Sequence, residues 1–358
     1  MTSESPAPDI AAAPGVAGAC GVPDVSVVIA SYNALEWLPR CLASVAGAAR
    51  RSTVEVIVVD NASEAPVREY LATAPHGVRV LQQDENLGFG RACNLGARHG
   101  RGRHVMLLNP DAVLAEGAID ALVDFLAADP GRGLVGGRTL RPDGSLNPSS
   151  CWGAPTLWSW FCSAVGLTSA FRYTSLFDPE AMGSWQRDSE RDVDIVSGCL
   201  LLATREAWDA LGGFDEDYFM YGEDADLSLR AREAGFRPAI TPAAVAVHAI
   251  GASSPTKLSK QRLLFRGKAT LARKRWSPVR WSAGLALLAG GVALRAAAET
   301  ALRRSDRTQR SLWAERRDWL AGWPPYTPAA PGPVAAPAAP EVAETAPSGA
   351  AAVPEPHL

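Results

Sequence analysis

The chain has 358 residues, of which 47% are hydrophobic and 20% charged, so it can bury a full core and still carry appendages. Its net charge of −3 at pH 7 supplies no global positive field, which argues against a nucleic-acid partner and requires any bound anion to be held by local groups. The 6 scattered cysteines form neither a close metal-ligand pair nor a disulfide scaffold, as expected of reduced thiols in a cytosol.

The two ends of the chain are predicted to lie outside the folded part. Residues 1–23 are rich in Ala, Pro and Gly and have no basic head, which indicates a disordered arm rather than a signal peptide or a transmembrane start. The Ala/Pro-rich tail at 324–358 is expected to be disordered too, because it cannot bury enough apolar surface. Between the two ends we expect a main domain over 24–252 and a helical segment over 253–323.

In the main domain, short apolar runs alternate with segments of helical periodicity. This alternation predicts an α/β fold with a mostly parallel, twisted sheet and helices on both faces. Strands are expected at 25–30, 54–59, 78–81, 105–109 and 134–141, and helices around 38–45, 92–100 and 119–126.

Polar residues follow three of these strands, where open α/β sheets bind ligands. The first two strands end at Ser31 and Asp60, and no glycine pattern of a dinucleotide or Walker phosphate loop follows either. Asp60 is suited to accept an N–H of a pyrimidine base or to bond a ribose, but it is equally suited to cap a turn. Asp111, after the strand at 105–109, is a candidate metal ligand, and the alternative is that Asn109-Pro110-Asp111 is only a turn.

The next segments are less regular. Residues 146–190 are rich in aromatic side chains without a sustained period, so they form an acceptor platform, ordinary core or an oligomer contact. Residues 194–204 are predicted to form one strong strand. Its Ser197-Gly198 step is a point where a substrate or another backbone can approach closely.

Three carboxylates, Glu223, Asp224 and Asp226, open a predicted helix that ends at Gly235. Such residues stabilise a helix start by capping and by the macrodipole, which is the alternative to a chemical role. Asp226 is four residues ahead of Arg230, a spacing typical of a structural ion pair. His248 ends another apolar run, as a satisfied polar residue or as a ligand of a divalent ion.

Taken together, these segments resemble the family-2 glycosyltransferases of the GT-A (Rossmann-like) fold, and most closely the bacterial rhamnosyltransferase branch. The resemblance covers about residues 24–252 in the family's order and spacing. The segments that carry it are 28–33 (VIASYN), 58–63 (VVDNAS), 86–90 (NLGFG), 108–111 (LNPD), 212–216 (GGFDE), 222–226 (GEDAD) and His248.

The resemblance implies an inverting transfer of a sugar from a nucleotide-sugar donor. Asp224 would be the general base, with Glu223 beside it, and Asp111 and His248 would hold Mg²⁺ or Mn²⁺ on the diphosphate. Many relatives have Asp-x-Asp where this chain has Asn109, so one carboxylate is missing and metal binding should be weaker. Asn-Pro-Asp is frequent among transferases thought to use dTDP-rhamnose. The donor-binding residues implied are Ser31, Asn33, Asp60, Asn61, Asn86, Gly88, Arg91 and Asn109.

The C-terminal segment is expected to contact a membrane. Residues 256–276 form a basic helix, and the apolar run at 281–294 is too short to span a bilayer but suited to lie in the interface. The alternative is a buried or dimer-forming helix, and a homo-oligomer remains open.

We therefore expect a transferase at the cytoplasmic face of the plasma membrane that extends a lipid-linked or cell-wall polysaccharide acceptor. Two alternatives remain. One is a galactofuranosyl or other hexosyl transferase that uses a UDP or GDP sugar, and the other is a catalytically silent GT-A scaffold.

Overall fold

The computed structural model describes residues 21–75, 77–249 and 256–327. The described residues up to Pro325 belong to one compact unit. The arm predicted at 1–23 and the tail predicted at 324–358 lie almost entirely outside the described residues.

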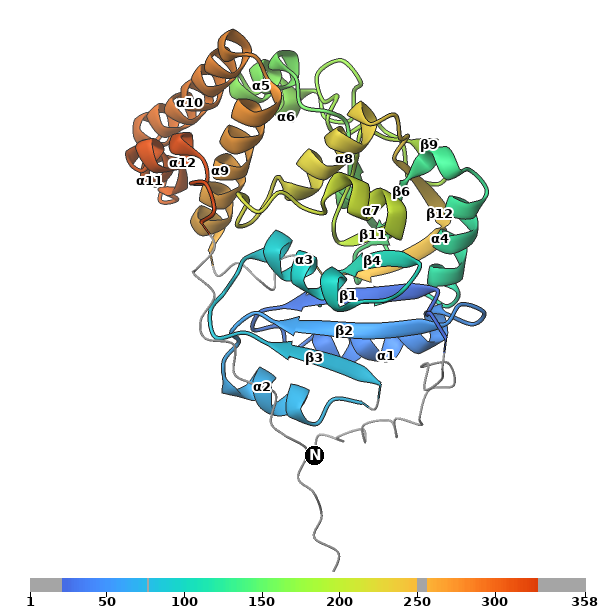
Figure 1. Ribbon diagram of the computed structural model, residues 1–358. Helices are drawn as coiled ribbons and strands as arrows, with labels where there is room; N and C mark the ends of the chain where they lie inside the picture. Colours follow the sequence, from blue (N-terminus) through green and yellow to red (C-terminus); the bar gives the residue numbers. More distant parts are fainter. Residues whose placement is uncertain (1–20, 76, 250–255, 328–358) are drawn as a thin grey trace, which may run out of the picture. The chain divides into compact units, whose positions relative to one another are not determined.

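A ten-stranded mixed sheet forms the centre of this unit, with its main path in the order β3-β2-β1-β4-β11-β6-β12-β5 (Figure 1). Neighbours within the β3-β2-β1-β4 part are parallel, as are β6 and β12, whereas β11 runs antiparallel to both of its neighbours. The strands of this path are β1 (Val25–Ser31), β2 (Val54–Asp60), β3 (Val78–Gln82), β4 (His104–Leu108), β5 (Ala112–Leu114), β6 (Leu134–Leu140), β11 (Leu200–Thr204) and β12 (Ala239–His248).

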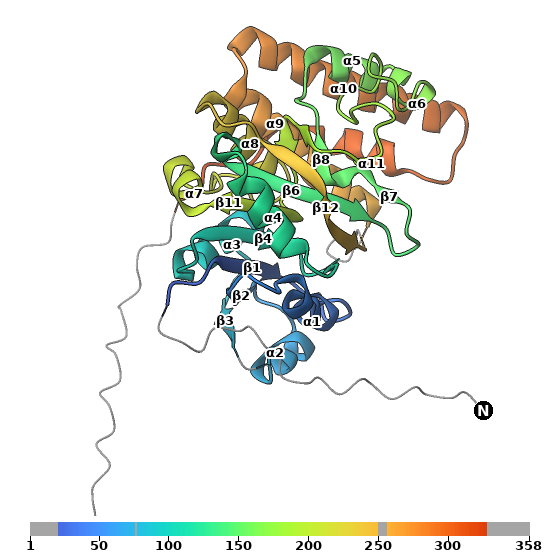
Figure 2. The ribbon, with the colours of Figure 1, turned by 90° about the vertical axis from the view of Figure 1, so that its right-hand side faces the viewer.

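Helices cover both faces of the sheet, which explains why the central strands are largely apolar and buried. All seven residues of β1 are buried, and successive residues point into different cores. Val27 packs into the core shared with α1 (Leu38–Ala48), whereas Val28 packs into the core shared with α3 (Phe89–His99). Helices α2 (Ala65–Ala72) and α4 (Ala118–Ala127) join the first face, and α7 (Arg205–Leu211) and α8 (Glu223–Glu233) join the second (Figures 1 and 2). The expected α/β fold with a mostly parallel sheet is confirmed.

The strand predicted over 194–204 is interrupted, which corrects that expectation. Its first part, β10 (Ile195–Val196), pairs with β8 (Cys151–Trp152) in a separate two-stranded sheet, and only β11 joins the main sheet. The chain bends between them at Gly198, where a Cβ atom would press against the Phe89 ring at 2.9 Å. The close approach expected at this step is present. The short strands β7 (Leu146–Asn147) and β9 (Arg191–Asp192) pair at the edges of β6 and β12.

The C-terminal helices share a hydrophobic core with α5 (Leu157–Ala164), which is followed by the short α6 (Leu167–Ala170). The core of this bundle includes Trp160, Leu288 and Trp319. The apolar run expected at 281–294 lies within a longer helix of 24 residues, so the expectation that the helix is too short to span a bilayer is wrong on length. The helices are α9 (Lys257–Arg275), α10 (Pro278–Ala301), α11 (Thr308–Ala314) and α12 (Arg316–Ala321).

Candidate active site

A cavity of about 600 Å³ lies at the carboxyl ends of β1, β2 and β4. The loop before α8, the start of α8 and one side of α9 close it on other sides. This is the position at which open α/β sheets bind ligands, because the loops that follow parallel strands meet there. The cavity brings together seven of the residues expected in the site, namely Asn61, Asn86, Asn109, Asp111, Glu223, Asp224 and His248.

Asp111 and His248 form a close pair at the cavity wall. The Nε2 atom of His248 lies 3.1 Å from Oδ1 of Asp111 and 3.3 Å from the amide nitrogen of Asn109. Antiparallel pairing of β12 with β5 fixes this arrangement, because it sets His248 opposite Ala112 in the backbone register. Burial lowers the pKa of His248, but hydrogen bonds with Asp111 and Cys199 outweigh burial and raise that pKa to about 10. The contact with Asp111 therefore favours the protonated form of His248.

The same pair fits a divalent metal ion that is held mainly by a substrate. A carboxylate oxygen suits Mg²⁺ or Mn²⁺, and a deprotonated imidazole is a common ligand of divalent ions. Among the described residues there is no group of three or more His, Cys, Asp or Glu side chains that could hold a metal ion. Asp111 and His248 are thus two candidate ligands within the described residues, and substrate phosphate oxygens and water would have to fill the remaining positions.

Asp224 and Glu223 lie next to each other in the first turn of α8, but their surroundings differ. Burial raises the pKa of Asp224, while backbone N–H groups of Gly198 and Ala225 donate to its two oxygens at 3.3 and 2.8 Å and favour the carboxylate. Burial, and then repulsion from Asp224, raises the pKa of Glu223 to about 8. Its Oε2 atom is buried and accepts no hydrogen bond from the described residues. Near neutral pH, burial and repulsion therefore favour the protonated form of Glu223, whereas the backbone hydrogen bonds favour the carboxylate form of Asp224.

Left-handed backbone at Tyr221 and Gly222 turns the chain into α8, so that both carboxyl groups reach the cavity. Tyr221 has φ 66° and Gly222 has φ 101°, and Gly222 is the N-cap of the helix. A Cβ atom at Gly222 would lie 2.9 Å from the ring of Tyr218, so glycine is needed for space as well as for conformation.

Asn61 and Asn86 hold the loop at 86–90 against the end of β2. The side-chain amide of Asn61 donates to Oδ1 of Asn86 at 2.9 Å and to the carbonyl of Gly88 at 3.1 Å. Gly88 has φ +81°, and a Cβ atom there would collide with the carbonyl oxygen of Phe219. Because the Phe89 N–H donates to the same carbonyl at 2.9 Å, this loop also supports the segment that carries the two carboxylates.

Ser31 and Asp60 lie behind the cavity lining, both fully buried at the ends of β1 and β2. One oxygen of Asp60 accepts from the backbone of Ser63 at 3.2 Å, and the other accepts from the side chain of Gln82. The hydroxyl oxygen of Ser31 has no hydrogen-bond partner among the described residues. As it stands, Asp60 stabilises its own loop.

Asn33, Gly88 and Arg91 are also absent from the cavity lining. The side chain of Asn33 accepts from the backbone N–H of Glu64 at 2.8 Å, with φ 51° at Asn33 itself. The guanidinium of Arg91 donates to the carbonyl of Glu216 at 2.7 Å and thereby fixes the loop before α8 to α3. These contacts organise the loops around the cavity.

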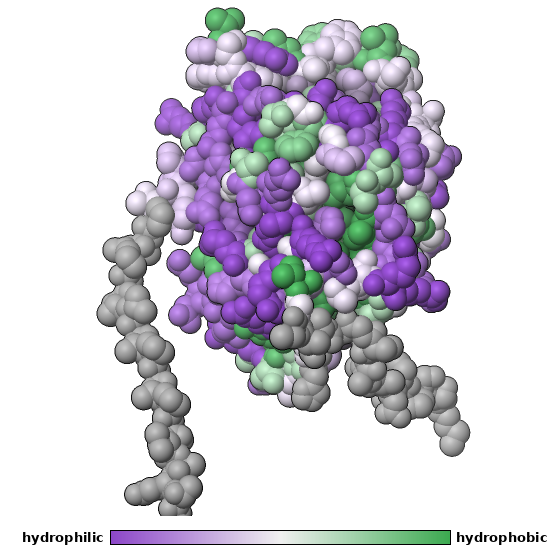
Figure 3. Space-filling view, turned by 45° about the vertical axis from the view of Figure 1, so that its right-hand side comes forward, coloured by the Kyte–Doolittle hydropathy of each residue, from purple (hydrophilic) through white to green (hydrophobic). Residues whose placement is uncertain are grey.

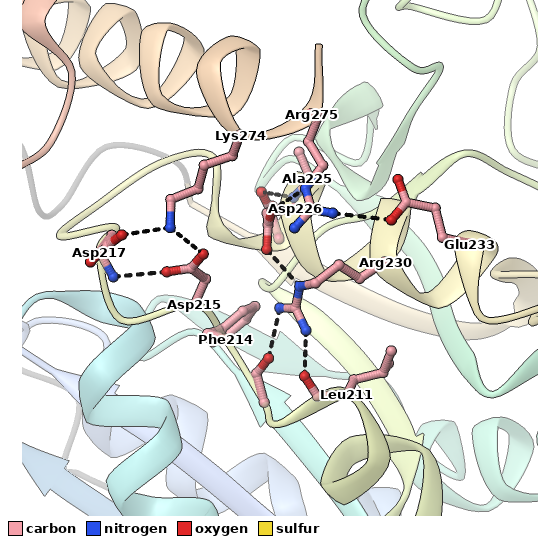
Figure 4. A network of polar contacts seen from close by, with 12 residues as sticks. Leu211, Phe214, Asp215, Asp217, Ala225, Asp226, Arg230, Glu233, Lys274 and Arg275 are labelled. Carbon is pink, nitrogen blue, oxygen red and sulfur yellow. Dashed lines mark hydrogen bonds and ion pairs between the residues drawn. The ribbon is translucent and has the colours of Figure 1, made fainter. Parts of the chain in front are cut away.

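Asp226, behind the two cavity carboxyl groups, anchors α8 to α9 (Figure 4). Its buried carboxylate accepts from Arg230 on the same helix and from Arg275 on α9, each at 2.7 Å. The pair with Arg230 confirms the structural role expected from sequence spacing. Lys274 makes a second link from α9, at 2.6 and 2.5 Å, to the carboxylates of Asp215 and Asp217.

Sequence reasoning missed the contribution of α9 to the cavity. The basic residues of this segment were expected to face lipid, yet some of them turn inwards. Two of these lysines alternate with two leucines at intervals of four, four and three residues, which places the four side chains on one helix face. This spacing was the available signal in the sequence. The α9 residues that line the cavity are Lys260, Leu264, Lys268 and Leu271.

Comparisons with known proteins place this geometry in context. Residues 23–266 match the model of the family described as "Glycosyltransferase like family 2". The chain is 33% identical over 313 residues to N-acetylglucosaminyl-diphospho-decaprenol L-rhamnosyltransferase of Mycobacterium tuberculosis, which covers 80% of this chain and 96% of that protein. The fold of this chain is similar to that in the crystal structure of S. aureus TarS 1-349 in complex with UDP-GlcNAc. The TM-score is 0.50, and the sequence identity is 16%, with 84% of this chain and 82% of that chain covered.

Proposed function

Because the chain belongs to glycosyltransferase family 2, we propose that it transfers L-rhamnose from dTDP-rhamnose, with inversion, to a hydroxyl of a lipid-linked or cell-wall polysaccharide acceptor. The observation that carries the donor and acceptor is the 33% identity to a decaprenol-linked rhamnosyltransferase over nearly its whole length. The cavity supports the chemistry, because it unites a candidate metal pair with a candidate base.

In the proposed reaction, the acceptor oxygen attacks the anomeric carbon of the sugar, and the bond from that carbon to the diphosphate oxygen breaks. Asp224 accepts the proton that the attacking hydroxyl loses. A single displacement inverts the anomeric centre and needs one proton acceptor, unlike the pair of carboxyl groups in a glycoside hydrolase. A divalent ion on Asp111 and His248 would offset the negative charge of the leaving diphosphate.

The donor's nucleoside is proposed to bind at the ends of β1 and β2, where Asn61 and Asn86 line the cavity. Asp60 would contact the pyrimidine base after a rearrangement that exposes it, since it is fully buried as it stands. The orphaned hydroxyl of Ser31 supports a polar contact at the same place. The remaining proposed donor contacts are Asn33, Gly88, Arg91 and Asn109.

We also propose that the protein lies at the cytoplasmic face of the membrane. Nine of the twelve large, exposed apolar side chains in the described residues lie within 158–176 and 279–302. These segments belong to α5, α6 and α10 and the turns that follow them, and the three helices lie side by side (Figures 1 and 2). Hydrophobic residues show on the surface there in Figure 3, among hydrophilic residues that cover most of that view. Such a surface suits an interfacial contact.

Helix α10 by itself is weak evidence for a membrane span. It is long and apolar enough to cross a bilayer by length and composition, the only such helix among the described residues. However, 33% of its most apolar window is buried inside the protein, against α5, α9 and α11. Packing of this kind fits a helix that rests on the membrane.

The decisive experiment offers the protein a panel of nucleotide sugars with Mg²⁺ or Mn²⁺ and a lipid-linked GlcNAc acceptor, and follows both nucleotide diphosphate release and product mass. We expect turnover with dTDP-rhamnose and a product with the inverted anomeric configuration. Turnover with only a UDP or GDP sugar would show that dTDP-rhamnose is not the donor. No turnover with any donor would favour a catalytically silent binding scaffold.

A further inference from the structure

One wall of the cavity is formed by a single face of α9. Lys260, Leu264, Lys268 and Leu271 occupy this face on successive turns, and the same cavity is lined by Asp111 and Asp224. Two ammonium groups and two apolar side chains thus alternate along a surface that adjoins the candidate reaction centre. The donor chemistry described above uses none of them.

The two lysines are incompletely neutralised. Lys268 Nζ lies 3.6 Å from Glu180, whose other oxygen accepts from the Ser159 hydroxyl at 2.6 Å. Its side chain is 37% exposed, so the ammonium remains accessible from the cavity. Lys260 forms no ion pair within the residues that the structure describes. Asp111 and Asp224 line the same cavity, but among the described residues neither carboxyl group forms an ion pair with Lys260 or Lys268.

An apolar surface continues from the lysines. Trp152, Pro155 and Leu264 line the same cavity, and α5 begins two residues after Pro155. The ring of Trp160 on α5 lies 5.7 Å from the ammonium of Lys268, and Trp158 on the same helix is 43% exposed. A ligand with an anionic group at the lysines would therefore find apolar contacts leading towards α5.

We propose that Lys260 and Lys268 bind the diphosphate of a polyprenyl-diphosphate-linked acceptor, with Leu264 and Leu271 against the first part of its prenyl chain. Ammonium groups bind phosphate as point charges, and the leucines supply the apolar contact that a free phosphate would not use. This inference rests on the proposed function and adds to it the place where the acceptor is held.

Direct binding tests the subsite without relying on transfer. Binding of farnesyl diphosphate to the full-length protein is measured by calorimetry in EDTA, so that no metal ion at Asp111 contributes, with farnesol and inorganic diphosphate as comparison ligands. We expect farnesyl diphosphate to bind more tightly than either of these. Replacing both lysines (Lys260→Met and Lys268→Met) should weaken its binding by roughly 10-fold or more, the scale of losing charged hydrogen bonds.

Matched variants separate charge from folding. Lys268→Arg keeps the charge and should retain binding, and Lys257→Met removes a charge from the same helix at a residue paired with Asp306 and should change nothing. Thermal melting of each variant reports whether it folds. Unchanged binding by the double variant would overturn the proposal, and so would inorganic diphosphate binding as tightly as the prenyl compound.

Kinetics distinguish the acceptor from the donor. In the transfer assay, the double variant should raise the acceptor KM by roughly 10-fold or more and leave the donor KM unchanged. A rise in the donor KM instead would assign the lysines to the donor diphosphate and overturn the inference. If farnesyl diphosphate binds through the lysines but no donor supports transfer, the proposed function fails and the subsite stands.

Discussion

Two adjacent carboxyl groups at the start of α8 differ in how fully the described residues satisfy their oxygen atoms with hydrogen bonds. Asp224 accepts from the backbone N–H groups of Gly198 and Ala225, whereas Oε2 of Glu223 is buried without a partner. Burial raises the pKa of both side chains, but it raises that of Glu223 to about 8. We therefore expect Glu223 to be the neutral acid of the pair and Asp224 to be the proton acceptor.

Asp224→Asn keeps the shape of the side chain but removes the proton acceptor. We expect turnover to fall by roughly 10²-fold or more, the usual scale of general-base catalysis, while donor affinity survives. Steady-state rates together with donor titration check this. An Asp224→Asn protein that works at the wild-type rate, beside a dead Glu223→Gln protein, would exchange the two roles.

Glu223 should also make stability depend on pH. Its folded-state pKa of about 8 lies above the ordinary value of 4.5, so between these pH values the folded protein binds more protons than the unfolded chain, and its stability falls as pH rises. Glu223→Gln removes the group whose ionisation destabilises the folded protein. The Tm of the variant should therefore rise relative to that of the wild type as pH increases, by roughly 2 °C or more at pH 9. Melting curves at pH 5, 7 and 9 measure the difference, and a constant difference would contradict the buried acid.

Asp111 is the only carboxylate in the 109–111 turn, so its removal should abolish the effect of metal on donor binding. Calorimetric titration with dTDP-rhamnose, in Mn²⁺ and in chelator, should show a metal-dependent affinity in the wild type that Asp111→Ala lacks. Asn109→Ala is the matched control, since it alters the same turn and keeps the carboxylate. If metal increases the donor affinity of Asp111→Ala as much as that of the wild type, Asp111 is a turn cap and not a metal ligand.

At the scale of elements, α8 depends on α9 for its position. The buried carboxylate of Asp226 lies between Arg230 and Arg275, and Arg275 reaches it from the last turn of α9 (Figure 4). Because the carboxyl groups that reach the cavity lie two and three residues before Asp226, any shift in this contact moves them. The C-terminal helices thus support the site as well as lining it.

Arg275→Met should therefore affect both stability and catalysis. Loss of one of two guanidinium partners of a buried carboxylate is expected to cost about 1–3 kcal/mol of unfolding free energy. We expect kcat to fall more than donor KM rises, because the first turn of α8 carries the candidate base. Arg280→Met, at an exposed position where the guanidinium lies over the Trp276 ring, should change neither. A loss of stability without a change in kcat would make the contact purely structural.

At the scale of the whole unit, apolar side chains are exposed mainly around α5, α6 and α10. Leu176 and Val22 are both 58% exposed, but only Leu176 lies in this region. Leu176→Glu should weaken sedimentation with anionic vesicles, whereas Val22→Glu should not, and neither should lower Tm appreciably because both positions are exposed. Binding should also weaken in high salt. If both variants sediment equally with the vesicles, the surface around α5, α6 and α10 does not contact the membrane.

The sequence by itself determined the strands and loops that form the sheet side of the site. Strands β1, β2 and β4 are apolar runs because helices cover both faces of the sheet, and the polar residues that follow them meet at one edge whatever the rest of the chain does. The motifs at 86–90, 108–111 and 222–226 needed only local spacing to be recognised. The family and the α/β fold followed from them.

Only the tertiary structure decided how distant segments complete the cavity. Strand β11 enters the sheet antiparallel between β4 and β6, the segment before it leaves to pair with β8, and α9 turns two lysines inwards. Each of these depends on contacts between segments far apart in the chain, such as that of Arg275 with Asp226. Local periodicity specifies which face of a helix is distinct, but not which partner will cover that face, because the partner is chosen by packing across the whole unit.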